Sequence, residues 1–193
     1  EPNSKLNINF MFTSEKVYRN ITYLCYTQNY FKPCIVQKPM IFLDMRNGIK
    51  NYISDEMDSC FSTMLDNFKN QGFAVGENSK LNGFEVSLKP RKVVIQTDSE
   101  VILTKTGETT TQKNFQVIVP SRIYEIMGVV QEVINQEAMF CHFEDSGFAV
   151  AYPEFSIDKY GVESGVRIYT IEDKVSKEKF RFAVRSCAIL PGY

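Results

Sequence analysis

The hydrophobic periodicity of the chain changes from helical to alternating twice, and this limits the folds that it can adopt. Between residues 44 and 71 apolar residues recur at three- and four-residue steps, the spacing of an amphipathic helix. Pro120-Ser121 opens a second such helix, with Ser121 as the expected N-cap, which ends near Phe140. Strand-like segments follow both helices, so the sequence predicts an α+β fold with two amphipathic helices packed on antiparallel β meanders.

Short alternating segments separated by polar turns predict the strands. The first meander is expected at 73–76, 83–88, 92–97, 100–106 and 114–119, with a turn at 107–111, and the second at 148–152, 166–172 and 179–187. An N-terminal β segment precedes both meanders, with a strand at 17–26. The apolar run 35–43 contains Pro39, which favours an edge strand or a loop.

No stretch rich in Gly, Pro or Ser separates the two helix-plus-meander segments, which favours one continuous domain over residues 1–193. Within it, 1–43 form the N-terminal β segment and a possible interface, 44–119 the first helix and meander, and 120–193 the second. The aromatic content of 1–43 suits either an interface with another chain or ordinary core packing.

The first patterned strand places four apolar side chains on one face, and these are Leu6, Ile8, Phe10 and Phe12. A strand of this kind can complete the sheet of its own chain. It can also be donated to a neighbouring subunit by β-strand addition, through residues 5–12, as in some filaments. The sequence leaves both arrangements open.

The charge balance excludes one class of partner. The chain has 22 Lys and Arg against 23 Asp and Glu, a net charge of −1 and a pI near 6.0. It therefore lacks the basic footprint of a nucleic-acid-binding protein.

The first residues do not have the layout of a signal peptide. The absence of an initiating Met favours a leader or membrane anchor that was removed, and a truncated sequence would look the same.

Five cysteines point to an oxidising compartment. Cys25 and Cys34 are separated by a turn-like stretch of eight residues, which suits a disulfide that closes a loop. Cys60, Cys141 and Cys187 leave one thiol over, and their pairing stays open. The triplet that begins at Asn20 is a possible glycosylation site, although one such triplet is about what chance gives in this composition.

Catalytic residue types concentrate only in the segment Cys141-His142-Phe143-Glu144-Asp145. Neighbouring residues diverge in a helix or strand, and the sequence holds no second His, so a Cys–His catalytic pair is not expected here. The glycines follow neither GxGxxG nor GxxxxGK spacing, and one His cannot complete a Cys2His2 zinc site. The sequence predicts no catalytic residue, no cofactor and no metal.

Four stretches together resemble the ectodomain region of uncharacterised, membrane-anchored envelope proteins of DPANN archaea. They are 21–26 (ITYLCY), the helix 50–73, the segment 113–125 and the closing 180–184 (FRFAV). The resemblance spans residues 20–187 and consists of packing patterns. It implies an N-terminal membrane helix followed by an ectodomain outside the cell, and it carries over no catalytic residue. This chain departs from the pattern in its shortness and in its Cys25 and Cys34 pair.

These observations favour an extracytoplasmic, non-enzymatic structural or interaction domain of a cell envelope, with protein partners or self-association. A surface filament or lattice subunit that assembles through its N-terminal strand is the first alternative. An enzyme that acts on envelope polymers is the second. No nucleic acid is expected as a partner, and membrane contact is expected only through an anchor that is absent from this chain.

Overall fold

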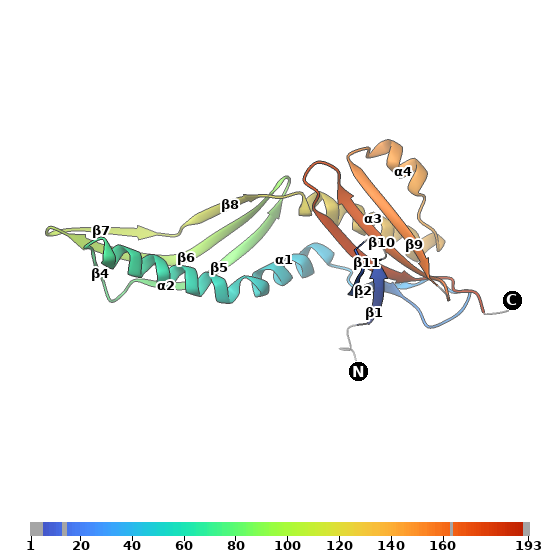
Figure 1. The fold of residues 1–193 in the computed structure, drawn as a ribbon, viewed down its shortest axis with the longest axis horizontal. Coiled ribbons are helices and arrows are strands. Elements are labelled where there is room, and N and C mark those ends of the chain that lie inside the picture. Colours follow the sequence, from blue (N-terminus) through green and yellow to red (C-terminus); the bar gives the residue numbers. More distant parts are fainter. Residues whose placement is uncertain (1–5, 13–14, 163, 191–193) are drawn as a thin grey trace. The chain divides into compact units, whose positions relative to one another are not determined.

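A computed structural model describes residues 6–12, 15–162 and 164–190. The chain forms two compact units, and each is described by itself. Unit 1 is built from the two ends of the chain, Glu1–Ile41 and Arg122–Tyr193, and unit 2 comprises Phe42–Ser121. The sequence predicted one continuous domain instead. Mixed helices and largely antiparallel sheets confirm the α+β class (Figure 1).

Unit 1 is a curved sheet whose central strands are covered on both faces. Its elements are β1 (Asn7–Phe12), β2 (Val17–Tyr26), β3 (Ile35–Val36), α3 (Ile123–Phe140), α4 (Asp145–Ala151), β9 (Phe155–Val162), β10 (Val166–Asp173) and β11 (Lys179–Arg185). The strand order is β1-β2-β11-β10-β9, and β3 pairs with β2. The β2–β11 pair is parallel, whereas the other pairs described in this sheet are antiparallel.

Strand β10 separates two cores. Because side chains alternate along a strand, Val166 and Ile168 point to one face and Tyr169 to the other. All three are buried. Helix α3 packs against β10 and β11 on the face of Tyr169, and its residues Ile126 and Met127 are fully buried. Most of β10 is therefore buried between the two cores, although four of its eight residues are polar or charged.

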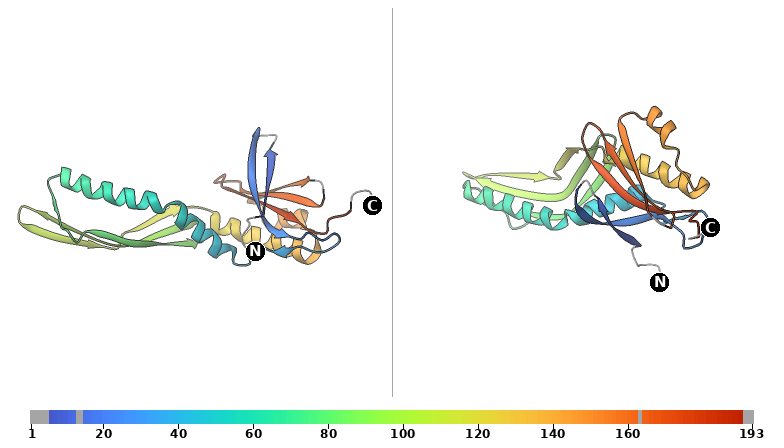
Figure 2. Two further views of the ribbon diagram at one scale, coloured as in Figure 1. Left: turned by 90° about the horizontal axis from the view of Figure 1, so that it is seen from below. Right: turned by 45° about the vertical axis from the view of Figure 1, so that its right-hand side comes forward.

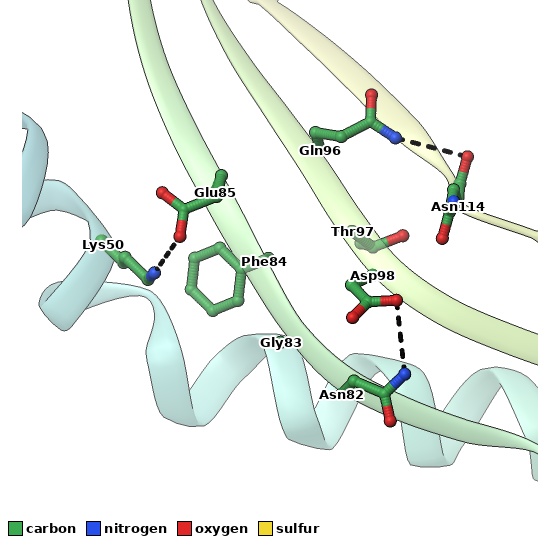
Figure 3. Close-up of a pocket in the computed structure, with 9 residues that line it drawn as sticks. All are labelled: Lys50, Asn82, Gly83, Phe84, Glu85, Gln96, Thr97, Asp98 and Asn114. Atoms are coloured by element: carbon green, nitrogen blue, oxygen red, sulfur yellow. Dashed lines mark hydrogen bonds and ion pairs between the residues drawn. The ribbon is translucent and has the colours of Figure 1, made fainter.

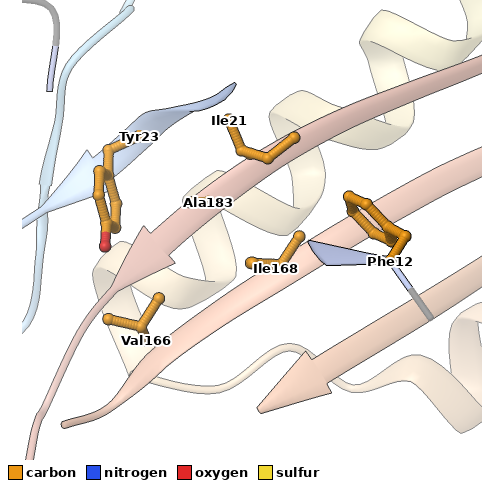
Figure 4. Close-up of a cluster of buried hydrophobic side chains, with 6 residues drawn as sticks. All are labelled: Phe12, Ile21, Tyr23, Val166, Ile168 and Ala183. Carbon is orange, nitrogen blue, oxygen red and sulfur yellow. The ribbon is translucent and has the colours of Figure 1, made fainter. Parts of the chain in front are cut away.

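The second core lies between the β1–β2 hairpin and strands β10 and β11 (Figure 4). Its buried members are Phe12, Ile21, Tyr23, Val166, Ile168 and Ala183, and the partly buried Leu6, Ile8, Phe10, Tyr26 and Val162 pack against them. The ring of Phe12 also lies 5.9 Å from that of Tyr160 on β9. The alternating face predicted for the N-terminal strand is therefore the face that packs within its own chain.

Unit 2 is a sheet with helices running along it (Figure 2). Its elements are α1 (Ile41–Tyr52), α2 (Ser54–Asn70), β4 (Ala74–Val75), β5 (Lys80–Lys89), β6 (Lys92–Lys105), β7 (Glu108–Lys113) and β8 (Gln116–Pro120). The long β6 is central, with β4, β5, β7 and β8 all paired to it. In the sheet Val86 and Val101 are each 1% exposed, whereas α2 has no fully buried residue. The helical stripe predicted for α2 is thus only half-buried.

Several expected elements differ from the structure. Residues 148–152 were expected as a strand, but 145–151 form α4, because the Glu144 side chain caps the helix by accepting from the backbone N–H of Ser146 and Gly147. Strand β9 was missed, and the expected turn 107–111 overlaps β7. Ser121 is not the N-cap of α3; that position is Arg122, with no side-chain cap. The first helix begins at Ile41 and is divided into α1 and α2.

We expect Gly165→Ala to lower the free energy of unfolding by about 2 kcal/mol. Gly165 has φ +71°, and an added Cβ would lie 2.5 Å from the Cα of Ala188. That atom belongs to the backbone, so the collision requires a main-chain shift. Gly161→Ala in β9 is the matched control, because its Cβ would meet nothing within 4 Å. Thermal unfolding followed by circular dichroism measures both variants, and equal melting temperatures would contradict the expectation.

Candidate functional site

An open groove of about 530 Å³ lies on unit 2 (Figure 3). Its lining comes from α1, β5, β6 and the link between β7 and β8, and consists of Lys50, Asn82, Gly83, Phe84, Glu85, Gln96, Thr97, Asp98 and Asn114. Cross-strand register brings these side chains together, because Glu85 pairs with Gln96 and Phe84 with Thr97. The volume lies within the range of small-molecule sites, which is about 300–1,000 Å³.

Hydrogen bonds between polar side chains organise the groove. The Lys50 ammonium donates to Glu85 at 2.7 Å, and the Asn82 amide donates to Asp98 at 3.3 Å. The hydrogen bond from Lys50 lowers the pKa of the Glu85 carboxyl below its ordinary value. Amide and carboxylate side chains offer both donors and acceptors to a polar ligand. The groove suits hydrogen bonding to a polar surface or chain.

The link between β7 and β8 gives the groove one wall. Asn114 has φ +56°, a conformation that Asn tolerates better than most residues. Its side-chain oxygen accepts from the Ser99 N–H at 3.2 Å, and the Phe115 N–H donates to the Thr97 hydroxyl at 2.8 Å. These bonds replace ladder bonds at the break between the two strands and fix the position of Asn114.

A charged cluster is buried in unit 1 between α3 and the sheet. Glu137 is fully buried, and its carboxylate accepts from the Arg167 guanidinium at 2.6 Å and from the Tyr169 hydroxyl. The Ser186 hydroxyl donates to the Glu137 backbone oxygen at 3.0 Å. Each carboxylate oxygen therefore has a donor, and the cluster joins the end of α3 to β10 and to the residue that follows β11.

Burial, followed by the hydrogen bond to Glu137, raises the pKa of Tyr169. The unfolded chain releases the tyrosine proton above about pH 10, whereas the folded chain retains it. The stability contributed by Tyr169 is therefore complete below pH 10 and is lost as the pH rises further. We expect Tyr169→Phe to show a shallower loss of stability between pH 10 and 12 in urea unfolding. Tyr18→Phe, at a residue 69% exposed, should leave the slope unchanged; equal slopes for Tyr169→Phe and wild type would contradict this expectation.

The structure contains two disulfides, both in unit 1. Cys25 is bonded to Cys34, the pair expected from their spacing, and Cys141 is bonded to Cys187. Cys60 on α2 is an exposed free thiol. The first disulfide closes the loop between β2 and β3, and the second ties the end of α3 to the segment after β11. Sequence spacing alone could not identify the second pair, because 46 residues separate its members.

In the segment 141–145, where catalytic residue types concentrate, the side chains have separate partners and surroundings. The sulfur of Cys141 is bonded to Cys187, Phe143 is fully buried, and His142 lies on the surface 4.0 Å from Glu144. Asn20 of the possible glycosylation triplet is exposed on β2. Within the described parts of the chain, no three His, Cys, Asp or Glu side chains gather in a way that could hold a metal ion.

Sequence reasoning missed Glu137 and the groove. Glu137 follows Val133 and Ile134 at helical spacing and so stands on the apolar stripe of α3, which was an available sign of a buried charge. The groove left no such sign, because its residues meet only through the pairing of β5, β6 and the β7–β8 link.

Comparison with known proteins found no match among family models, curated proteins or solved structures. In the described part of the chain, no helix is long and apolar enough to cross a membrane.

Proposed function

We propose that this chain is an extracytoplasmic, non-enzymatic structural or interaction domain of a cell envelope. The observation that carries the proposal is the pairing of four of the five cysteines in two disulfides. Disulfides persist in oxidising compartments and are rare in the cytosol. The resemblance of 21–26, 50–73, 113–125 and 180–184 to archaeal envelope ectodomains supports the same location.

Three features support an interaction role rather than an enzymatic one. The thiol of Cys141 is committed to a disulfide, and the carboxylate of Glu137 is occupied by Arg167 and Tyr169. The groove of unit 2 is open, and seven of its nine lining residues have polar or charged side chains. An accessible polar surface of this kind suits contact with a protein or another polar polymer of the envelope.

Alkylation of the native material before reduction tests the location. We expect iodoacetamide to modify Cys60 alone, and peptide mapping without reductant to recover 25 linked to 34 and 141 linked to 187. Reduction followed by a second alkylation serves as the control, because it should expose the other four thiols. Five reactive thiols in the native material would overturn the extracytoplasmic assignment.

One observation supports the alternative of a filament or lattice subunit. β1 lies at the end of the strand order β1-β2-β11-β10-β9, where a strand can exchange between chains. In the structure β1 pairs with β2 of its own chain over its whole length, from Asn7 with Thr22 to Phe12 with Val17. Donation would therefore require this pairing to open.

A further inference from the structure

Strand β8 of unit 2 is an edge strand built mostly from exposed apolar residues. All residues of Gln116–Pro120 are exposed, with Val117 at 49%, Ile118 at 54% and Val119 at 44%. One side of β8 pairs with β6, and in the described ranges of the chain no strand pairs with its other side. An edge of this kind offers unpaired backbone groups to a further strand.

The side chains of β8 give this edge little protection. Edge strands in natural proteins are commonly protected by charged side chains, by Pro or by bulges. Strand β5, another partner of β6, carries Lys80, Glu85 and Lys89, whereas β8 carries no charge. Pro120 lies at the end of β8 and leaves the three apolar residues before it open to pairing. Strand β8 is therefore suited to contact with another strand.

The pairing with β6 shows which backbone groups of β8 point outward. The Thr97 N–H donates to the Phe115 carbonyl at 2.8 Å, and beyond the other end of β8 the Ser121 N–H donates to the Arg91 carbonyl at 3.2 Å. Hydrogen-bonded and non-hydrogen-bonded pairs alternate along an antiparallel ladder. In this register the odd-numbered residues of β8 bond to β6. The backbone groups of its even-numbered residues therefore point away from β6.

A second copy of β8 matches these outward groups. Gln116 and Ile118 each offer an N–H and a carbonyl, and Pro120 offers a carbonyl alone. When two β8 strands lie antiparallel with Ile118 opposite Ile118, each Ile118 N–H can donate to the other Ile118 carbonyl. Each Gln116 N–H can then donate to the Pro120 carbonyl of the other copy. The N–H that Pro120 lacks leaves only the Gln116 carbonyl to water, so the arrangement uses every outward donor of β8.

The side chains fit the same arrangement. Val117 of one copy lies opposite Val119 of the other on one face, and the two Ile118 side chains meet on the opposite face. Cross-strand pairs of β-branched residues stabilise a sheet, and no like charges meet. Because Val-Ile-Val reads the same in both directions, the contact is self-complementary, as a two-fold dimer requires. We propose that β8 pairs antiparallel with β8 of a second copy of this chain, about a two-fold axis at Ile118.

This proposal gives the interaction role proposed above a partner and rests on that role. The alkylation experiment depends only on the cysteines, and β8 contains none. A chain that fails to dimerise therefore overturns this proposal without bearing on the disulfides.

Analytical ultracentrifugation of the purified full chain tests the dimer. Because the contact is one short strand, we expect a dissociation constant of about 100 µM. Ile118→Lys should raise it by about tenfold or more, since two like charges then face each other. Val175→Lys is the matched control, at a residue 88% exposed in the turn between β10 and β11, and it should dimerise as the wild type does. Circular dichroism should show that both variants stay folded.

Three outcomes of this experiment would overturn the proposal. The first is a wild type that stays monomeric up to about 500 µM. The second is an Ile118→Lys variant that dimerises as tightly as the wild type. The third is dimerisation that Phe12→Ala abolishes and Ile118→Lys does not, because it would indicate exchange of β1.

Hydrogen exchange of single backbone amides, followed by NMR, tests the pairing in the wild type itself. Between about 50 and 500 µM protein, the Gln116 and Ile118 amides should exchange about twofold or more slowly as the dimer forms. The Val117 and Val119 amides are the internal control, because their bonds to β6 protect them at both concentrations. Gln116 and Ile118 amides whose exchange does not depend on concentration would contradict the pairing of β8 strands.

Discussion

Glu137→Leu is expected to lower the free energy of unfolding by about 3–5 kcal/mol. The Glu137 side chain is fully buried, and its removal leaves the Tyr169 hydroxyl without its acceptor. The Arg167 guanidinium loses its carboxylate partner and keeps the Ser186 carbonyl, at 3.2 Å. The Nε atom of Arg167 is already buried without a hydrogen-bond partner. An uncompensated charge in this position is therefore costly. Urea unfolding at pH 7, followed by circular dichroism, measures the effect.

Two further variants test whether this loss of stability comes from the unpaired charge of Arg167. Glu137→Leu combined with Arg167→Leu should recover most of the stability, because the unpaired charge is then also removed. Glu132→Leu, on an exposed position of the same helix, should change stability by less than about 0.5 kcal/mol. If the single Glu137 variant were as stable as the wild type, the buried pair would not hold α3 to the sheet.

The sequence predicted helix α3 well because its information is local. Apolar residues at three- and four-residue steps predicted one buried face made of Ile123, Ile126, Met127, Val130, Val133, Ile134 and Ala138. Five of these residues are buried, and Ile123 and Ala138 are partly buried. The helix and the α+β class follow from such patterns. Strand β9 was missed because Lys159-Tyr160-Gly161 shows no clear apolar alternation, and its position depends on pairing with β10.

The pairing of strands that lie far apart in the chain could not be predicted from the sequence. Strand β2 runs parallel to β11, so Tyr23 pairs with Ala183 across the length of the chain. This contact makes unit 1 from both ends of the sequence, and it brings the loop after β2 beside the segment after β11. Local periodicity carries no record of such a pairing, which is why neither unit 1 nor the Cys141–Cys187 disulfide could be derived from spacing.

Phe12→Ala is expected to lower the free energy of unfolding by about 3 kcal/mol. Phe12 is 3% exposed, its ring centre lies 4.9 Å from that of Phe10, and the Arg181 guanidinium lies 4.2 Å from it. The truncation would leave a cavity between the β1–β2 hairpin and the central strands. Met11→Ala is the matched control on the opposite face of β1, where the side chain is 43% exposed, and it should cost less than about 0.5 kcal/mol.

The same pair of variants separates a strand that completes its own sheet from one that is donated. If β1 stays in its own chain, Phe12→Ala lowers the free energy of unfolding at every protein concentration, and light scattering shows no change of mass. If β1 is exchanged between chains, the wild type forms assemblies whose stability rises with concentration, because association is linked to folding. Phe12→Ala would then reduce the mass of the assembly while Met11→Ala would not. The packing of Phe12 against Ile21 and Ile168 of its own chain leads us to expect the first result.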